Sequence, residues 1–272
     1  MQMLPIITPS RAVQPAVILT LDIVIPCFNE ERRLDVDALL GALDATPGLR
    51  LTCVDDGSSD ATLSVLQRLA AAASGRVRVL PLSRNQGKAE AVRQGLLQAC
   101  IGPDAAQLVG YWDADLSTPL DAIEDFRRVM IRLPEVQMVF GSRRALLGHR
   151  IRRSAMRRII SRICATLAGA AIGLSVGDSQ CGAKLMRNSD DLCAALARPF
   201  DSGWLFDVEL FARLSNRCAT PHEAFFELPL TQWHEVPGSK VTSRAVLSSG
   251  LLMLRLIGRN RLAPSRPQGR AA

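Results

Sequence analysis

Segments typical of β-strands and of α-helices alternate along the first half of this chain, and this alternation limits the possible folds more than any other feature. Short apolar, β-branched runs predict buried strands at residues 21–26, 49–54, 77–82 and 108–112. Segments with a helical apolar rhythm lie between them, at residues 30–43, 60–73 and 88–100. One strand and one helix recur about every 30 residues, which predicts an α/β fold with a Rossmann-like, mostly parallel mixed sheet flanked by helices.

Each predicted strand is followed by a polar cluster that is prone to form a turn. The clusters begin at Pro26, Asp55, Arg84 and Asp113. In open α/β sheets, ligands bind beyond the carboxyl ends of the strands, near the point where the strand order reverses. We therefore expect the four clusters to meet on one rim of the sheet and to form a binding site there.

The cluster after the fourth strand contains two carboxylates two residues apart, Asp113 and Asp115. On a loop after a strand, both can reach one divalent cation, and a hard cation readily shares its coordination with a substrate phosphate. The structural alternative is a helix N-cap beside an acid on the surface. The first interpretation predicts a Mg²⁺ or Mn²⁺ site at this loop.

The chain of 272 residues carries a net charge of +7 and has a pI of about 9.4. A basic balance indicates a polyanionic partner: nucleic acid, a nucleotide substrate or an anionic membrane surface. The seven cysteines form no Cys-x-x-Cys pair, which argues against zinc and favours reduced thiols in a cytosolic protein. We expect no signal peptide, and the longest uncharged run, 163–177, is shorter than the roughly 20 residues of a membrane-spanning helix.

The second half has a different character. Residues 143–162 hold eight arginines and no acid, and predict an amphipathic helix or a loop that enters one. Further strands are predicted at 138–141, 183–186 and 225–231, and further helices at 206–214 and 245–257. We expect a flexible lead-in at 1–20, one folded domain at 21–242, an amphipathic C-terminal helix at 243–263 and a disordered tail at 264–272.

Five motifs in the first half, taken together, resemble family 2 glycosyltransferases with the A-type nucleotide-sugar fold. They are I-P-C-F-N-E-E at 25–31, V-D-D-G-S-S-D at 54–60, N-Q-G-K-A-E-A-V-R-Q-G at 85–95, D-A-D-L-S-T-P at 113–119 and G-S-R at 141–143. The resemblance implies that residues 21–143 form a nucleotide-sugar half and residues 144–242 an acceptor half of one catalytic domain.

Motifs in the second half resemble the polyprenyl-phosphate branch of this family, and most of all the dolichyl-phosphate β-glucosyltransferases and their bacterial relatives. They are D-S-Q-C-G-A-K-L at 178–185, W-L-F-D-V-E-L at 204–210 and W-H-E-V-P-G-S-K at 233–240. The resemblance implies metal-dependent, inverting transfer of a hexose, glucose from UDP-glucose, to polyprenyl phosphate. It implies a protein bound peripherally to the cytoplasmic face of the membrane.

The resemblance also implies a donor site on the predicted rim. Asp115 would ligate the metal with Asp113 alongside, and Asp55 would receive the N–H of the base. A cation at a helix start, as at Lys88, suits a diphosphate or a base carbonyl. The expected donor-binding residues are Pro26, Phe28, Glu30, Asp55, Asp56, Arg84, Lys88, Asp113 and Ala114.

The acceptor is expected to be a lipid phosphate, which is already a nucleophile and needs no strong general base. Asp115, Asp178 and Arg143 are the expected catalytic residues, with Asp178 orienting the acceptor or a donor hydroxyl. The expected acceptor contacts are Arg143, Arg152, Arg153, Gln180, Lys184, Trp204, Glu209, Ser239 and Lys240. The structural alternatives are a turn-capping role for Asp178, a place in the core for Trp204, and an ion pair with a neighbouring arginine for Glu209.

Other functions stay open at this point. One alternative keeps the fold but takes GDP-mannose or another nucleotide sugar as donor. Another takes a saccharide as acceptor, and its hydroxyl would require a carboxylate base. A further alternative is a protein that binds a nucleotide sugar or the membrane and has lost catalysis. The arginines of 143–162 interleave with isoleucines, which favours an interfacial helix on anionic lipid over nucleic-acid binding. The segment 245–257 would pair subunits in a homo-oligomer or lie on the membrane.

Overall fold

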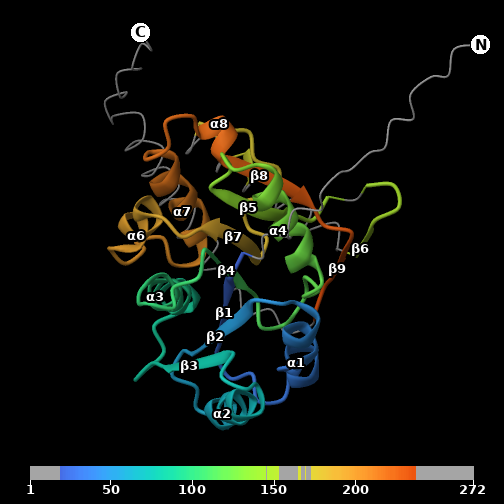
Figure 1. Cartoon of the computed structure of the whole chain (residues 1–272), viewed down its shortest axis with the longest axis vertical. Helices are drawn as coiled ribbons and strands as arrows, with labels where there is room; N and C mark the ends of the chain where they lie inside the picture. The colour runs from blue at the N-terminus through green and yellow to red at the C-terminus, as the bar shows by residue number, and fades with distance from the viewer. Residues whose placement is uncertain (1–18, 145, 153–164, 167–168, 170–172, 237–272) are drawn as a thin grey trace, which may run out of the picture.

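The computed structural model describes residues 19–144, 146–152, 165–166, 169 and 173–236 (Figure 1). Its centre is a seven-stranded sheet. The strands follow the order β3 (Val77–Pro81), β2 (Leu49–Asp55), β1 (Leu21–Cys27), β4 (Leu108–Trp112), β7 (Ala183–Arg187), β5 (Met138–Ser142) and β8 (Phe225–Pro229). The chain thus builds one edge of the sheet with its first three strands and the other edge with its last.

Strand β7 runs against its neighbours, whereas the other paired strands of this sheet are parallel. It lies between β4 and β5, with Ala183 opposite Trp112 and Lys184 opposite Phe140. Six strands therefore end at one rim of the sheet, and β7 begins there. The loop that precedes β7 is brought beside the loops that follow β4 and β5.

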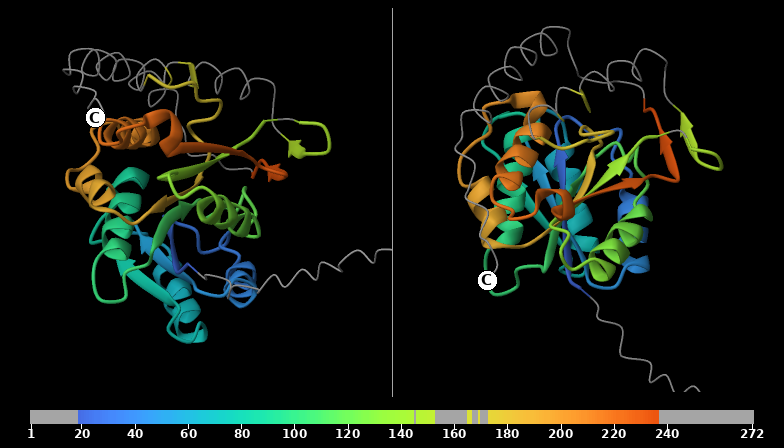
Figure 2. Two further views of the ribbon diagram at one scale, coloured as in Figure 1. Left: turned by 45° about the horizontal axis from the view of Figure 1, so that its top comes forward. Right: turned by 90° about the horizontal axis from the view of Figure 1, so that it is seen from above.

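Helices cover both faces of the sheet (Figures 1 and 2). The helices of the described part are α1 (Val36–Ala45), α2 (Thr62–Ala72), α3 (Lys88–Cys100), α4 (Ala122–Arg132), α6 (Asp190–Leu196), α7 (Phe206–Ser215) and α8 (Pro221–Ala224), with a short 3₁₀ turn η1 (Gly203–Leu205). Side chains of α3, α6 and α7 share one apolar cluster, and those of α1, α2 and α4 share the other. The expected α/β architecture with flanking helices is confirmed.

The buried strands contribute side chains to both apolar clusters, because successive side chains of a strand point to opposite faces of the sheet. In β1, Ile23 and Ile25 pack among α1, α2 and α4, whereas Val24 packs against α3. All three are completely buried. This is why the strand reads as a continuous apolar run rather than as an alternation of polar and apolar residues.

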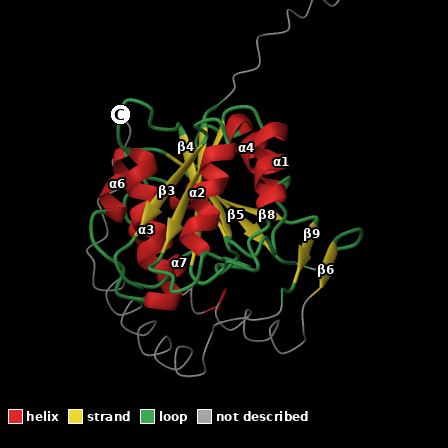
Figure 3. Cartoon of the chain, turned by 90° about the horizontal axis from the view of Figure 1, so that it is seen from below, coloured by secondary structure: helices red, strands yellow, loops and turns green. Residues whose placement is uncertain are grey.

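A second sheet has two short parallel strands, β6 (Arg150–Arg152) and β9 (Gln232–His234). They lie together at one side of the molecule, beyond β8 (Figure 3). The described part of the basic segment 143–162 is thus a loop followed by β6. The predicted interfacial helix falls on residues outside the described part, as do Arg153, Ser239, Lys240, the predicted helix 243–263 and the tail.

The first helix begins at Val36, six residues later than the sequence pattern predicts. Residues 30–34 form a turn instead, in which the N–H groups of Arg33 and Leu34 donate to the Glu30 carbonyl. The Asp35 carboxylate then caps α1 by accepting the Ala38 N–H at 2.9 Å. None of the helices in the described part of the chain has the length and apolarity needed to span a bilayer.

Candidate active site

The four polar clusters meet on the rim where the parallel strands end. The loop after β2 binds directly to the loop after β3, because the Asp56 carboxylate accepts the N–H of Gln86 at 2.7 Å and that of Gly87 at 2.8 Å. Burial raises the pKa of Asp56, although these two N–H groups oppose the shift. Asp56 therefore holds the β3–α3 loop in place, and its two oxygens are occupied by the protein's own backbone.

Gly57 makes this junction possible. Its φ of +63° lies in the left-handed region, and a side chain at this position would overlap the backbone of Arg84. Asp55, the last residue of β2, is 3% exposed, and its carboxylate accepts the Ser58 N–H at 3.3 Å. Asp55 is thus a buried carboxylate beside two loops that are in direct contact.

The loop after β1 starts beside Asp55, since Cys27 pairs with Asp55 and its carbonyl accepts the Asp56 N–H at 2.8 Å. Pro26 and Phe28 are half-buried, and the buried Glu30 donates its backbone N–H to the Thr62 hydroxyl at 2.8 Å. This bond ties the β1–α1 loop to the start of α2. The structure thus brings the expected base-binding residues together around Asp55.

Lys88 and Asp113 are in direct contact at the centre of the rim. The Lys88 amine lies 2.5 Å from the Asp113 carboxylate, and it sits 5.9 Å and 5.8 Å from the ring centres of Tyr111 and Phe206. Burial opposes the charge of Lys88, but Asp113 and then Asp207 raise the pKa of the amine above its ordinary value. Lys88 is thus a cation at the start of α3 that lies beside the Asp113 carboxylate and over the Tyr111 and Phe206 rings.

The backbone of Asp113 is held by the loop that precedes β7. Its N–H donates to the Gly182 carbonyl at 2.9 Å, and the Asp113 carboxylate fills the space that a Gly182 side chain would occupy. Asp115 is half-buried and accepts the Ser117 N–H at 3.0 Å. Directly after Asp115, Leu116 adopts a left-handed φ of +49°, which turns the chain sharply.

These two carboxylates fit a divalent cation. Both are partly exposed on one tight turn, and oxygen ligands suit Mg²⁺ or Mn²⁺. Within the described residues, no cluster of three or more acids, cysteines or histidines has the spacing of a complete metal cage. A cation held here would draw its remaining ligands from a substrate or water, as Mg²⁺ does at phosphate-handling sites.

Arg143 and Asp178 form the second charged centre of the rim. The guanidinium binds both carboxylate oxygens at 2.7 Å, and the Arg143 backbone N–H adds a bond of 3.0 Å. The side chain of Asp178 is 3% exposed and that of Arg143 is 14% exposed. Burial alone would lower the pKa of Arg143, but the bonds to Asp178 raise it above its ordinary value. The guanidinium also stacks 5.5 Å from the ring centre of Trp233.

The structure removes two expected acceptor contacts from the rim. Lys184 is completely buried, where its amine contacts the Asp207 carboxylate and the Cys181 carbonyl, each at 2.7 Å. Glu209 is 5% exposed and accepts from the Ser202 backbone and hydroxyl. It also pairs with Arg213 at 2.6 Å. Both are partners inside the core, and for Glu209 the ion-pair alternative is confirmed.

Other expected contacts have mixed outcomes. Gln180 lies in the loop before β7, and its buried amide nitrogen has no hydrogen-bond partner among the described residues. Trp204 is half-buried and packs on the apolar cluster of α7. Ala114 is buried beneath the Asp113–Asp115 turn, and Arg84 is exposed at the rim. Arg152 lies on β6, which pairs with β9.

The comparisons with known proteins fit this site. The sequence model of the family described as Glycosyl transferase family 2 matches residues 22–192, which include Asp55, Lys88, Asp113, Asp115, Arg143 and Asp178. The chain belongs to glycosyltransferase family 2. The resemblance drawn from the motifs is therefore confirmed, and the matched range includes the loops of the rim after β1, β2, β3, β4 and β5.

Relatives with assigned names cover most of this glycosyltransferase. It is 31% identical over 261 residues to the dolichyl-phosphate beta-glucosyltransferase of Mus musculus, across 87% of this chain and 75% of the relative. It is 31% identical over 245 residues to the enzyme of the same name from Saccharomyces cerevisiae, across 81% of this chain and 69% of the relative.

A solved structure supports the fold. The glucosyl-3-phosphoglycerate synthase of Mycobacterium tuberculosis, determined in complex with Mn²⁺, UDP and glucosyl-3-phosphoglycerate, aligns with a TM-score of 0.64 at 17% identity. The alignment covers 88% of this chain and 80% of the synthase. At this identity the likeness shows a shared fold.

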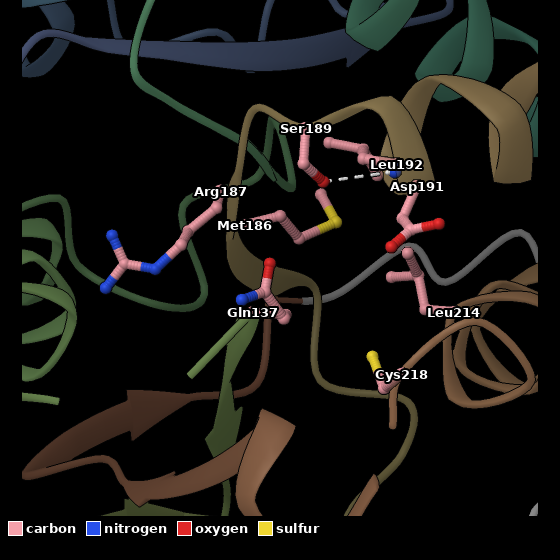
Figure 4. A pocket seen from close by; sticks show the side chains of 8 residues that line it. All are labelled: Gln137, Met186, Arg187, Ser189, Asp191, Leu192, Leu214 and Cys218. Carbon is pink, nitrogen blue, oxygen red and sulfur yellow. Dashed lines mark hydrogen bonds between the residues drawn. The ribbon is translucent and has the colours of Figure 1, made fainter. Parts of the chain in front are cut away.

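One pocket of this glycosyltransferase lies away from the rim. It is lined by residues around the start of β5 and the end of β7, including Gln137, Arg187 and Cys218 (Figure 4). These strand ends lie at the end of the sheet opposite to the rim that carries Asp113 and Arg143. The pocket therefore belongs to the packing between α6, α7 and the sheet.

Sequence reasoning missed the buried partners of the site. Tyr111 donates its hydroxyl to Asp207, which also pairs with Lys184. Burial and then the charge of Asp207 raise the pKa of Tyr111 well above its ordinary value. The available signal was Asp207, an acid between the apolar residues Phe206 and Val208 at the start of α7. An acid in such a position indicates a buried partner, because acids are almost never fully buried unpaired.

Proposed function

We propose that this glycosyltransferase moves glucose from UDP-glucose to the phosphate of a polyprenyl lipid, with inversion at the anomeric carbon. The observation that carries the proposal is the bidentate contact of Arg143 with Asp178. The names of the mouse and yeast relatives support the acceptor class and the sugar. The Mn²⁺ and UDP bound by the synthase of the same fold support the donor class.

The Arg143–Asp178 contact bears on the acceptor because a sugar hydroxyl needs a general base, whereas a phosphate does not. Both oxygens of Asp178 are bound by Arg143, and Asp113 is bound by Lys88. A phosphate monoester has a second pKa near 6, so it is largely dianionic at neutral pH. It can attack the anomeric carbon without giving up a proton. A site whose central carboxylates are already paired with cations therefore favours a phosphate acceptor.

The roles of the rim residues follow from their positions. Asp115 and Asp113 would hold Mg²⁺ or Mn²⁺, and when bound the cation would stabilise the charge of the departing diphosphate as a Lewis acid. Lys88 presents a fixed positive charge at the start of α3, which suits a phosphate of the donor. Asp55, with Pro26, Phe28 and Glu30 of the neighbouring β1–α1 loop, would bind the base.

Arg143 would hold the acceptor phosphate against the donor. Two anions repel each other, and the positive charge of a guanidinium beside them reduces that repulsion. Asp178 fixes the orientation of Arg143, and Trp233 covers its face. The unpartnered amide of Gln180 is a donor for a phosphate oxygen or a sugar hydroxyl. The protein would meet its lipid as a peripheral protein on the cytoplasmic face of the membrane.

The test is release of nucleoside diphosphate from a panel of nucleotide sugars, with and without polyprenyl phosphate, in Mg²⁺ or Mn²⁺. We expect release from UDP-glucose that depends on the lipid and is lost with EDTA. Asp115→Asn should lose turnover. Asp121→Asn is the matched control, since Asp121 is an exposed acid on the same segment.

Two results would contradict the proposal. Lipid-dependent release from GDP-mannose alone would change the donor and keep the acceptor. Release that needs a saccharide and ignores the lipid would replace the acceptor. In that second case a carboxylate base must exist, and Asp178→Asn should abolish turnover rather than weaken acceptor binding.

A further inference from the structure

Two leucines project from the turn that links β5 to β6. Leu147 is fully exposed at 104% and Leu146 is 47% exposed, whereas large apolar side chains are mostly buried in the described part of the chain. We call residues Leu146–His149 the leucine turn. Adjacent exposed leucines on one turn are an apolar patch, and such patches mark interaction surfaces.

The leucine turn is fixed by hydrogen bonds. The His149 N–H donates to the Leu146 carbonyl at 3.0 Å, and Gly148 supplies the left-handed φ of +84° that the turn requires. The His149 ring contacts the Leu230 carbonyl at 2.7 Å through Nδ1. The Arg150 N–H donates to the Thr231 carbonyl at 2.8 Å, where the β6–β9 pairing begins. The fold thus presents the leucines on a braced turn.

The surroundings of the leucine turn are basic. Arg150 is exposed on one side of the turn. On the other side, the side chain of Arg144 is 62% exposed, with its Nε 3.7 Å from the Glu227 carboxylate. The chain contains no acid from Arg143 to Gly177. An apolar tip between cations matches a surface that is apolar inside and negatively charged outside, which is the chemistry of an anionic bilayer.

The leucine turn is also connected to the acceptor side of the rim. The segment leaves the rim at Arg143, which Asp178 holds, and returns through β6 beside β9 (Figure 3). The His234 N–H of β9 then donates to the Ser117 carbonyl at 3.2 Å, next to the Asp113–Asp115 turn. A surface bound by the leucine turn would therefore lie next to the Arg143 site.

We propose that the leucine turn enters the head-group region of an anionic bilayer, with Arg144 and Arg150 at the level of the lipid phosphates. This docking would bring a phosphate carried by a membrane lipid to Arg143. The inference rests on the proposed lipid-phosphate acceptor for its purpose, but the docking itself is measurable without any turnover.

The test is flotation of the full chain with vesicles of phosphatidylglycerol and phosphatidylcholine, and with vesicles of phosphatidylcholine alone. We expect binding to the anionic vesicles that weakens with salt. Leu146→Glu with Leu147→Glu should weaken it by at least tenfold, because two apolar side chains no longer leave water. The matched control is Ile101→Glu, which changes a 66% exposed side chain at the C-terminal end of α3.

Activity assays separate this docking from the proposed function. The double variant should keep the turnover of the wild type on a short, water-soluble polyprenyl phosphate and lose turnover on a long-chain acceptor embedded in vesicles. If no phosphate acceptor is used but anionic vesicles still bind through the leucine turn, the acceptor assignment fails and the docking stands.

Three outcomes would overturn the docking. The first is equal vesicle binding by the wild type and the double variant. The second is an equal loss of binding in Ile101→Glu. The third is a dimer of the wild type, without vesicles, that the double variant does not form, which would assign the leucine turn to a contact with a second copy of the chain.

Discussion

At the scale of single residues, the structure bears most directly on Asp178. Its carboxylate is enclosed and bound on both oxygens by Arg143, which supports a role in positioning that cation rather than in accepting a proton. Asp178→Asn should therefore raise the KM for the acceptor by about tenfold or more and lower kcat by less than tenfold. Loss of a general base would instead lower kcat by about 10²–10⁴-fold.

The control for this prediction is Asp191→Asn, which removes an exposed contact with Arg217 at 3.5 Å. Exposed pairs of this kind contribute about 0–1 kcal/mol, so this variant should behave as the wild type in both parameters. A collapse of kcat in Asp178→Asn with an unchanged KM would show that the carboxylate does take a proton.

Gly182 is a second residue whose identity is set by the site. Its missing side chain leaves the space in which the Asp113 carboxylate lies. Gly182→Ala should displace that carboxylate and weaken binding of Mn²⁺ and of the donor, measured by calorimetry, by about tenfold or more, because metal sites tolerate ligand shifts of only about 0.5 Å. The fold should persist.

Gly41→Ala is the matched control. Gly41 lies within α1, and nothing stands within 4 Å of the position that its Cβ would take. Alanine is favoured over glycine inside a helix by about 0.5–1 kcal/mol, so this variant should be slightly more stable and bind the donor normally. Normal donor binding in Gly182→Ala would contradict the assigned role of the contact.

At the scale of elements, one buried ionic cluster joins β4, β7 and α7. Asp207 of α7 accepts from Tyr111 of β4 and pairs with Lys184 of β7, and Lys184 also holds the Cys181 carbonyl. The cluster lies under the Lys88–Asp113 contact, since Lys88 sits over the Tyr111 and Phe206 rings. It fixes the three elements that carry the centre of the rim.

This cluster predicts a stability pattern. Lys184→Met leaves the Asp207 carboxylate buried without its cation and should lower the free energy of unfolding by about 3–5 kcal/mol. Adding Asp207→Asn removes the stranded charge and keeps an oxygen for the Tyr111 hydroxyl. The double variant should therefore recover at least half of the loss, as measured by urea unfolding. Equal losses in the single and double variants would contradict this account.

The elements also show what the sequence could and could not predict. Strands β1 to β4 and helix α3 were predicted because each is long enough for apolar periodicity to show. Strands β6 and β9 have three residues each, which is too short for a period. The order of the elements does not indicate that β7 is antiparallel to β4 and β5. The chirality rule applies to connections between parallel strands and does not exclude one antiparallel strand in the sheet.

The candidate site divides in the same way. Asp113, Asp115 and Lys88 were found because polar residues directly after buried strands fall on the rim. Lys184 and Glu209 were misplaced because a charged residue in a motif looks like a ligand contact. Their burial depends on partners in other elements, such as Asp207. Nothing in a local sequence pattern reveals a contact between a strand and a distant helix.

At the scale of the whole molecule, stability should depend on the ionisation of Asp22. Burial raises the pKa of this β1 carboxyl above 3.8, while the Thr52 hydroxyl at 2.8 Å and then Arg50 oppose the shift. The folded state then holds the proton more tightly than the unfolded state. Stability contributed by this group is greatest below pH 3.8 and falls as the pH rises through the raised folded pKa.

Asp22→Asn removes this dependence and keeps an oxygen for Thr52. The stability of the variant relative to the wild type should therefore increase between about pH 3.5 and pH 7, as measured by urea unfolding at both ends. The control is Asp37→Asn, an exposed acid on α1, which should show no such trend. A constant difference across this range for Asp22→Asn would contradict the prediction.

The reversed strand β7 has a consequence for how such an enzyme can change over evolution. Because β7 separates β4 from β5, the first 143 residues cannot form this continuous sheet without a strand from the remainder. A module joined to the chain after residue 143 would therefore have to supply that strand as well as its own loops. Substitutions in the loop before β7 would change the surroundings of Asp113 without changing the sheet, because Gly182 of this loop lies against the Asp113 turn.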